Sequence, residues 1–289
     1  MEFEQISPPA THQVQSFPKL SVNDCEKVTL STKSPTDRLL SPCSKQILVK
    51  KINAEEKKSS ESGNIWAEEE NFPQPYQSII LGSSSVKRKS VLERNGWSFT
   101  TASPDIDEKA IRDDDPLILP LLVAKAKASA LTDRLTESIL TPTILLTSDQ
   151  IVLFKQEIRE KPQIEEEARE FLSSYSNDTV STVTAVTATH LPSGRQSSDV
   201  NIASVSFKLI PEETVETVLA TAEVYSSAGA LVIENEVLRG FIQHIEGDID
   251  SLRGLPMRST VRCIHAVTDI PVTIEDPTMP NTENKLDRR

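Results

Sequence analysis

The chain has 289 residues, and 37% of them are hydrophobic, enough for a packed core over part of its length. Its formal net charge of -12 argues against a general affinity for nucleic-acid backbones or anionic membrane surfaces. Three widely spaced cysteines without metal-ligand spacing argue against a disulfide framework or a zinc site, and no apolar run approaches the roughly 20 residues of a membrane helix.

The two ends of the chain differ in composition from its centre. Residues 1–75 mix Ser, Pro, Thr, Lys and Glu without a sustained period of 2 or 3.6, which predicts a disordered extension, and residues 276–289 predict a disordered tail. Glu2 and Glu4 disfavour a secretory signal and weaken the case for an organelle transit peptide. We therefore expect a cytoplasmic protein, with an organelle as the alternative, and a folded domain over residues 78–275.

In chain order, the central residues predict alternating strands and helices. Residues 78–81 are a short apolar run halted by Gly82, typical of a buried strand, and residues 86–94 predict a helix that ends at Asn95-Gly96. Residues 180–190 and 200–209 alternate at period 2 and predict paired strands. Further strands are expected at 97–101, 144–146, 151–154 and 237–245, and further helices at 117–131, 162–173, 211–222 and after Leu255-Pro256. This order predicts a mixed α/β domain.

Small hydroxyl residues followed by cations lie at the first strand-to-helix junction, in Gly82-Ser83-Ser84-Ser85-Val86-Lys87-Arg88-Lys89. Amides at a helix N-terminus are unsatisfied and carry positive partial charge, so this pattern is typical of a polyphosphate cradle. Two other interpretations stay open. Ser85 can simply cap the helix while residues 87–89 form a solvated face, or the basic residues can form a nuclear-import or phosphorylation patch.

Two acidic motifs follow along the chain. The string Asp105-Ile106-Asp107-Glu108 offers the carboxylate oxygens that hard divalent cations bind, although such strings are also ordinary solvated loops, the interpretation that we give residues 113–115. Thr147-Ser148-Asp149-Gln150 falls between two apolar runs. A carboxylate at a strand end indicates a general base or a metal ligand, and a turn aspartate is the alternative.

A lysine precedes the helix expected at residues 162–173. Lys161 lies next to Pro162 and can point from there at a phosphate, although an ordinary surface lysine is the alternative.

Taken together and in this order, these motifs resemble the signature of the Maf (septum-formation-protein-like) family, over nearly the whole folded part. That signature has Ser-x-x-Arg-Arg after a strand, then Ile-Asp-Glu, a Lys-Ala helix, an Asp-led motif and Lys-Pro. The matching residues here are Ser85-Val86-Lys87-Arg88-Lys89, Ile106-Asp107-Glu108, Lys125-Ala126, Ser148-Asp149-Gln150 and Lys161-Pro162. The likeness continues with Ser227-Ala228-Gly229, Glu234, Ile245-Glu246-Gly247-Asp248 and Gly254-Leu255-Pro256.

The resemblance implies both a fold and an activity. Maf-family proteins are similar to inosine triphosphate pyrophosphatases, which are α/β proteins with an elongated, twisted mixed sheet and two lobes around a cleft. They hydrolyse a nucleoside triphosphate to the monophosphate and pyrophosphate with a divalent metal cation, Mg²⁺ or Mn²⁺. A homodimer is compatible with this likeness, and neither a nucleic acid nor a membrane is an expected partner.

The resemblance also assigns roles to individual side chains. Asp149 is expected to accept the proton of the attacking water, and Glu108 to help hold the metal. The triphosphate is expected to be gripped by hydroxyl and cationic side chains, those of Ser83, Ser85, Arg88, Lys125 and Lys161.

Base specificity is expected to depend on a second set of side chains. Ser148-Asp149-Gln150 followed later by Glu234 looks like the branch that resembles 7-methyl-GTP pyrophosphatases, rather than the dTTP/UTP branch. A carboxylate can accept hydrogen bonds from the N1–H and the amine of a guanine edge, which gives Glu234 a physical role. The specificity candidates are Lys87, Gln150 and Glu234.

The chain departs from the family pattern beside the proposed phosphate lysine. The usual Gly-Lys-Pro is here Glu160-Lys161-Pro162, which places a negative charge next to Lys161, and Val86, Lys89 and Asn235 are further departures. A catalytically weak Maf-fold protein that binds a nucleotide or acts as a scaffold is therefore the alternative to a clearance enzyme for modified nucleotides. Regulation through the Ser-rich N-terminal residues is compatible with either.

Overall fold

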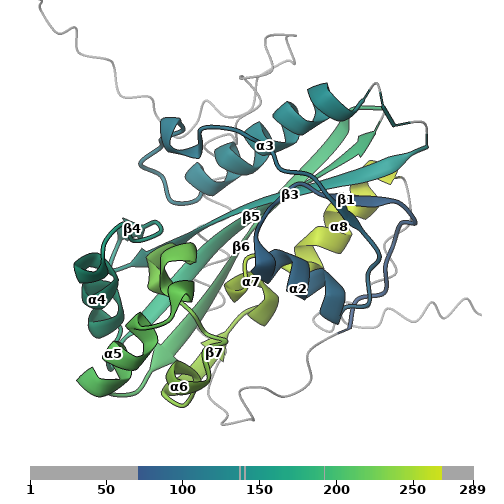
Figure 1. Ribbon diagram of the computed structural model, residues 1–289. Helices are drawn as coiled ribbons and strands as arrows, with labels where there is room; N and C mark the ends of the chain where they lie inside the picture. Colours follow the sequence, from purple (N-terminus) through teal and green to yellow (C-terminus); the bar gives the residue numbers. More distant parts are fainter. Residues whose placement is uncertain (1–70, 137, 140, 192, 269–289) are drawn as a thin grey trace, which may run out of the picture. The chain divides into compact units, whose positions relative to one another are not determined.

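A computed structural model describes residues 71–136, 138–139, 141–191 and 193–268 (Figure 1). The strands among them are β1 (Ile79–Leu81), β2 (Thr100–Thr101), β3 (Thr143–Phe154), β4 (Glu157–Arg159), β5 (Thr179–Leu191), β6 (Arg195–Phe207) and β7 (Ile242–Glu246). They form one sheet in the order β2-β1-β3-β5-β6-β7, with β4 paired to β3. β1 is parallel to β2 and β3, and the other pairs are antiparallel, so the predicted mixed α/β class is confirmed.

Helices lie between most of these strands in the chain. They are α2 (Val86–Arg94), α3 (Leu119–Leu135), α4 (Glu165–Ser174), α5 (Glu212–Leu219), α6 (Glu236–Arg239), α7 (Ile249–Leu252) and α8 (Met257–Thr268), with short 3-10 turns η2 (Glu108–Ala110), η3 (Ala222–Ser226) and η4 (Ala228–Ala230). Among the described residues, none of these helices combines the length and the apolar character that crossing a bilayer requires.

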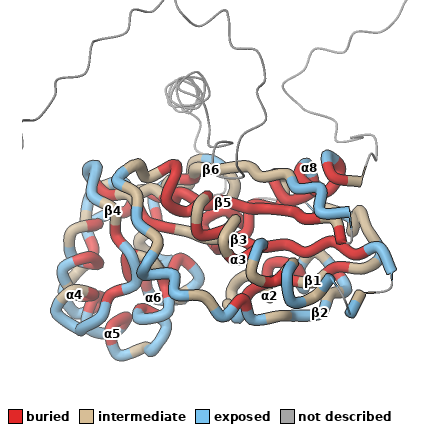
Figure 2. The backbone as a smooth tube through the Cα atoms, turned by 90° about the horizontal axis from the view of Figure 1, so that it is seen from above, coloured by how far each residue is buried: buried red, intermediate tan, exposed pale blue. Residues whose placement is uncertain are grey.

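Side chains of β3 alternate between two layers of helices. Leu145 packs with Leu131 of α3, whereas Ile144 and Leu146 belong to a cluster with side chains of α2 and α8. α3 therefore covers one face of this end of the sheet, and α2 and α8 cover the other, as Figure 1 shows. The central strands β3 and β5 are buried along most of their length (Figure 2).

The far end of the sheet has a separate core. There Phe154, Leu172 and Val218 belong to a cluster that joins the sheet to α4, α5 and α6. Two lobes, each with its own apolar centre, are thus connected by the long strands β3, β5 and β6.

One edge of β3 is open between two short strands. β1 pairs with this edge only at residues 144–146, and β4 only at residues 152–154. Over residues 147–151 no described strand pairs with it, while β5 occupies the opposite edge throughout. Since the chain after β1 and the chain after β4 both leave the sheet here, residues 82–85 and 160–163 flank the opening.

The structure corrects three strand predictions. The two strands expected at residues 144–146 and 151–154 are one strand, β3, so Asp149 lies inside a strand rather than at its end. The strand expected at 237–245 is the helix α6 followed by β7, because the side chain of Asn235 caps a helix by accepting from the amides of Val237 and Leu238. The strand expected at 97–101 is confined to β2.

The described domain begins before residue 78. The amide of Phe72 donates to Oδ1 of Asn95 over 3.0 Å, and Nε1 of Trp97 donates to the carbonyl of Phe72 over 2.7 Å. Phe72 and Tyr76 also pack against the cluster of α2 and α8. Residues 71–77 therefore belong to the folded unit, whereas the disorder expected for residues 1–70 and 276–289 lies outside the described residues.

A substitution at Gly229 is expected to destabilise the lobe of α4 and α5. The φ of Gly229 is +56°, and a Cβ there would come within 2.7 Å of Oη of Tyr175 and 2.8 Å of Val152. We expect Gly229→Ala to lower the free energy of unfolding by about 3 kcal/mol, measured by urea denaturation, because both the backbone and the packing oppose it. Gly194→Ala is the matched control, with φ +71° but open space, and should cost about 1 kcal/mol. Equal losses of stability in the two variants would show that contacts of the new Cβ with Tyr175 and Val152 do not contribute to the effect.

Candidate active site

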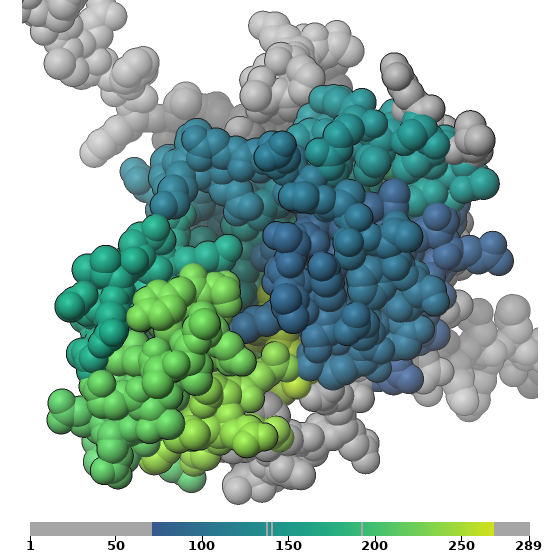
Figure 3. All heavy atoms as spheres, viewed as in Figure 1, coloured from purple at the N-terminus to yellow at the C-terminus, as the bar shows by residue number. Residues whose placement is uncertain are grey.

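A pocket of about 500 Å³ occupies the opening beside β3, a volume typical of small-molecule sites. Its walls come from the turn after β1, the start of α2, η2, α3, β3, the segment after β4, the turn before η4, and the turn after α7. Figure 3 shows the hollow on this face, between the blue atoms of α2 and the light green atoms of the segment from α5 to η4. Both lobes therefore contribute side chains to one cavity.

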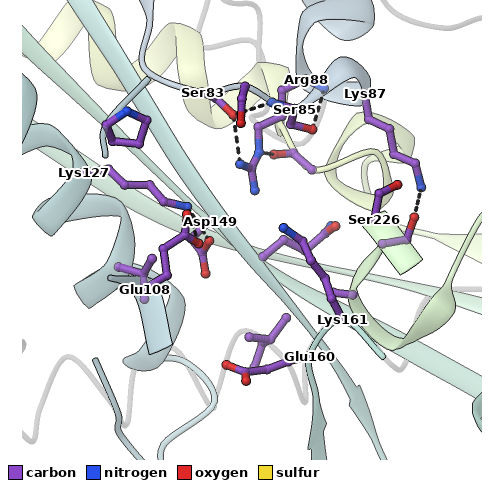
Figure 4. A pocket seen from close by; sticks show the side chains of 18 of the residues that line it. Ser83, Ser85, Lys87, Arg88, Glu108, Lys127, Asp149, Glu160, Lys161 and Ser226 are labelled. Carbon is purple, nitrogen blue, oxygen red and sulfur yellow. Dashed lines mark hydrogen bonds and ion pairs between the residues drawn. The ribbon is translucent and has the colours of Figure 1, made fainter. Parts of the chain in front are cut away.

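The serine-rich turn is pre-organised around Arg88. Oγ of Ser83 accepts hydrogen bonds from the amide of Ser85 (3.1 Å) and from Nη1 of Arg88 (3.3 Å), and Ser85 caps α2 by accepting from the amide of Arg88. Nε of Arg88 donates to the carbonyl of Gly254 over 2.9 Å. Burial lowers the pKa of the Arg88 guanidinium, whereas the charges of Asp149 and Glu108 raise it. The guanidinium is thus held in place on the side of the pocket where Asp149 and Glu108 act on it (Figure 4).

Two carboxylates converge on one lysine deep in the pocket. Nζ of Lys127 lies 2.8 Å from Oδ1 of Asp149 and 2.9 Å from Oε2 of Glu108. The lysine side chain is only 4% exposed, that of Asp149 14%, and that of Glu108 45%. Asp107 helps to aim Glu108, because its carboxylate caps η2 by accepting from the amide of Lys109. Three distant segments therefore meet at one cation.

The lysine of this group is Lys127, and the structure does not bring the predicted Lys125 into the pocket. The chain has two Lys-Ala pairs in succession, and only the second has its lysine on the buried face of α3. Residues four apart on that face are Leu119, Val123, Lys127 and Leu131. Lys125 is partly buried on another side of the helix, where burial lowers the pKa of its ammonium. The packing of α3 against the sheet therefore distinguishes the two lysines, and the local sequence does not.

Alternation along β3 divides the Ser148-Asp149-Gln150 motif between two sides of the strand. Asp149 faces α3 and Lys127, whereas Ser148 donates to the carbonyl of Gly254 over 2.9 Å. Nε2 of Gln150 donates to Oγ1 of Thr184 (2.9 Å) and to the carbonyl of Ser251 (2.7 Å). Ser148 is buried, while Asp149 and Gln150 both line the pocket. The amide orientation of Gln150 is therefore fixed by the protein itself.

Lys161 and its acidic neighbour both line the pocket. The Lys161 side chain extends towards the centre of the cavity in Figure 4. The Glu160 carboxylate pairs with Nη1 of Arg112 over 3.0 Å, and both side chains are about half exposed. The Glu160 carbonyl accepts from the amide of Gly229 over 2.8 Å, which ties this segment to η4. The extra negative charge thus has a partner outside the cavity.

Lys87 connects the two lobes across the pocket. Nζ of Lys87 donates to Oγ of Ser227 over 2.6 Å and lies 3.5 Å from the carbonyl of Leu231. Burial lowers the pKa of its ammonium, and the charges of Glu234 and Glu223 oppose that effect. The predicted specificity residue therefore reaches from α2 to the segment between η3 and η4.

Glu234, the other predicted specificity residue outside β3, is not among the residues that line the pocket. Its Oε1 accepts from Nη1 of Arg94 over 2.7 Å and from Nε of Arg253 over 3.1 Å. Arg253, which the sequence gave no reason to select, does line the pocket. The Glu234 carboxylate therefore contacts a residue of the pocket wall, Arg253, and does not line the cavity itself.

Residues 78–267 match the family model described as Maf-like protein. The chain belongs to the Maf-like family. A 7-methyl-GTP pyrophosphatase of Dictyostelium discoideum is 38% identical over 193 residues, which are 66% of this chain and 97% of that protein. A dTTP/UTP pyrophosphatase of a Geobacillus species is 34% identical over 64% of this chain and 95% of that protein. A 7-methyl-GTP pyrophosphatase of Pseudoalteromonas translucida is 28% identical over 62% of this chain and 86% of that protein. Residues 34–59, outside the described residues, match the Spo12 family model.

The Maf-like pocket contains eight of the ten side chains that the motifs singled out. They are Ser83, Ser85, Lys87, Arg88, Glu108, Asp149, Gln150 and Lys161. Lys125 and Glu234 lie outside it. The cavity is lined instead by Lys127, two residues after Lys125, and by Arg253, which contacts Glu234 in space. Arg253 carries no local signal, because a residue between a four-residue helix and Gly254 is placed only by the tertiary fold.

Proposed function

We propose that this Maf-like chain hydrolyses a nucleoside triphosphate to the nucleoside monophosphate and pyrophosphate. The observation that carries the proposal is the meeting of Asp149, Glu108 and Lys127 in one pocket, opposite the serine-rich turn. The pyrophosphatase names of the relatives from Dictyostelium and Geobacillus support the same reaction class.

The triphosphate would lie among the cations at the α3 side of the pocket. Arg88, Lys127 and Lys161 supply positive charge from three different segments, and the Ser83 and Ser85 hydroxyls lie at the start of α2. Phosphoryl transfer depends mainly on positioning and on neutralising the charge of the transferred group. These side chains would both position the triphosphate and neutralise its charge.

Asp149 would act as the general base. Its carboxylate accepts the proton of a water molecule as the water oxygen attacks the α-phosphorus, and the bond from that phosphorus to the α,β-bridging oxygen breaks. Pyrophosphate then leaves with the bridging oxygen, and the water oxygen stays on the monophosphate. A carboxylate in the middle of a strand is held rigidly for this task, while 14% exposure leaves it reachable from the cavity.

The same carboxylates fit a divalent cation. Glu108 and Asp149 are close enough to share one ammonium, and Mg²⁺ is commonly held by one or two carboxylates together with phosphates of the substrate. Glu108, the more accessible of the two, would hold Mg²⁺ or Mn²⁺, with Asp149 beside it as the general base. The ion, when bound, neutralises charge on the triphosphate.

For the base, we infer a modified or non-canonical nucleotide such as 7-methyl-GTP. The Dictyostelium relative carries that name and is more similar to this chain than the dTTP/UTP relative from Geobacillus. The Ser148-Asp149-Gln150 motif and Glu234 favour the same choice.

A hydrolysis panel tests the proposal. Purified chain is incubated with Mg²⁺ and GTP, 7-methyl-GTP, ITP, ATP, UTP, dTTP or CTP, and pyrophosphate and monophosphate are measured. We expect equal amounts of the two products, loss of turnover with excess chelator, and, in ¹⁸O-labelled water, label in the monophosphate alone. Binding without turnover of any triphosphate would instead select the scaffold alternative, and label in pyrophosphate would exclude attack on the α-phosphorus.

The charge of Glu160 is expected to weaken phosphate binding only slightly. Because Glu160 is half exposed and paired with Arg112, we expect Glu160→Gln to lower KM by about threefold with kcat little changed. Steady-state kinetics at two ionic strengths measure this, and the difference should shrink at high salt. Glu165→Gln, which removes a carboxylate paired with Arg169 outside the pocket, is the control. A rise in KM would show that Glu160 assists binding.

A further inference from the structure

Four side chains of alternating charge form a closed ring beside the pocket. Oε1 of Glu234 lies 2.7 Å from Nη1 of Arg94 and 3.1 Å from Nε of Arg253. Oδ1 of Asp250 lies 3.0 Å from Nη1 of Arg253 and 3.7 Å from Nη2 of Arg94. The side chains of Arg253 and Asp250 are 6% and 8% exposed, so this part of the ring is buried. The ring ties α2, the turn at residue 234 and α7 together.

Arg253 is the ring member that lines the cavity, together with Gln150 and Lys87. Acidic side chains gather around it: Glu234 and Asp250 contact it directly, and the charges of Glu234 and Glu223 also act on Lys87. A triphosphate would meet these carboxylates unfavourably, whereas Lys127 and Lys161, which are assigned to the phosphates, come from α3 and the segment after β4. The Arg253 side is therefore suited to the base rather than to the phosphates.

We propose that Arg253 recognises the nucleobase and selects bases that present a carbonyl oxygen, as guanine, hypoxanthine, uracil and thymine do. This inference rests on the proposed function and names the substrate class for the same pocket. Glu234 and Asp250 are positioning residues, since they hold the guanidinium and act on the base only through it.

The selectivity follows from the donors of an arginine. A guanidinium carries five N–H donors and no acceptor, so it can bond a carbonyl oxygen but opposes the amino group of adenine or cytosine, which is itself a donor. Leaving a donor unmatched in a desolvated site costs far more than losing an exposed contact. Because two carboxylates fix the guanidinium, the penalty is not relieved by side-chain rotation.

Matched substrate pairs test the inference. UTP and CTP differ at C4 of the pyrimidine, a carbonyl against an amino group, and ITP and ATP differ in the same way at C6 of the purine. We expect the wild-type chain to favour UTP over CTP and ITP over ATP in kcat/KM by at least about tenfold. Arg253→Met keeps the length of the side chain without donors and should bring both ratios close to one, mainly through a higher KM for UTP and ITP.

Further variants separate recognition from folding. Arg253→Lys keeps the charge but loses the fork, so it should keep part of the selectivity. Glu234→Gln should lower the ratios less than Arg253→Met does. Arg262→Met, which breaks an ion pair with Asp199 outside the pocket, is the control and should leave the ratios unchanged.

Several results would overturn the inference. A wild-type ratio near one, an Arg253→Met ratio equal to that of the wild type, or an equal loss for carbonyl and amino bases would each show that Arg253 does not recognise the base. Greater loss of selectivity in Glu234→Gln than in Arg253→Met would assign recognition to Glu234 itself. If no triphosphate turns over, the proposed function fails separately, and dissociation constants of the same four nucleotides with Mg²⁺ give the ratios that decide about Arg253.

Discussion

Asp149→Asn is expected to lower kcat by about three orders of magnitude, with little change in the stability of the fold. The asparagine amide cannot accept the proton of the attacking water. Its Oδ1 can still accept a hydrogen bond from Nζ of Lys127, the contact that Asp149 makes over 2.8 Å. The substitution therefore removes the proposed base and retains the local packing of β3 against α3.

Pyrophosphate release under saturating Mg²⁺ and substrate measures the effect of Asp149→Asn, and thermal unfolding checks the fold. Asp199→Asn is the matched control, because Asp199 is a strand carboxylate paired with Arg262 and lies outside the pocket lining. It should change kcat by no more than about twofold. If Asp149→Asn keeps a tenth or more of the wild-type kcat, another group accepts the proton.

Local signals explain which elements of the fold are predictable. The bounds of α2 agree with the prediction because its cap at Ser85 and its end at Asn95-Gly96 are written in adjacent residues. β5 and β6 pair as expected, since long Val- and Thr-rich segments with period-2 alternation specify strands, although β5 is buried on both of its faces.

The break expected within β3 shows the limit of such signals. Thr147 and Ser148 interrupt the apolar pattern, yet Oγ1 of Thr147 donates to the carbonyl of Ala124 over 2.8 Å and Ser148 donates to that of Gly254. These acceptors lie on other segments, so polar residues continue the strand without leaving an unsatisfied group. The sequence around residues 147–150 contains no information about either acceptor.

The candidate site is predictable to a similar extent. The order of motifs indicated which segments meet, and the structure places eight of the ten selected side chains in the pocket. The position of Glu234 behind Arg253 depends on the mutual arrangement of α2, α7 and the turn at residue 234, which no spacing reveals. The choice between Lys125 and Lys127 likewise depends on how α3 packs against the sheet, because apolar residues occur on all sides of this helix.

Lys127→Met is expected to lower kcat/KM by about a hundredfold or more, whereas Lys125→Met should change it by about twofold at most. Among the described residues, Lys127 forms the ion pairs of both Glu108 and Asp149, so its loss leaves two carboxylates facing each other and removes charge from the phosphate side of the pocket. Lys125 is two residues away on the same helix and outside the pocket lining, which makes it a control matched in type, element and chain position.

Thermal unfolding must accompany these kinetics, because breaking a buried ion pair can destabilise a protein by several kcal/mol. Lys127→Arg separates the two effects: it keeps the positive charge but not the compact ammonium that fits between Oδ1 of Asp149 and Oε2 of Glu108. We expect Lys127→Arg to stay folded and to recover part of the activity that Lys127→Met loses. Equal losses for Lys125→Met and Lys127→Met would mean that the phase of α3 does not determine which lysine serves the substrate, and the phosphate side of the pocket would then have to be assigned anew.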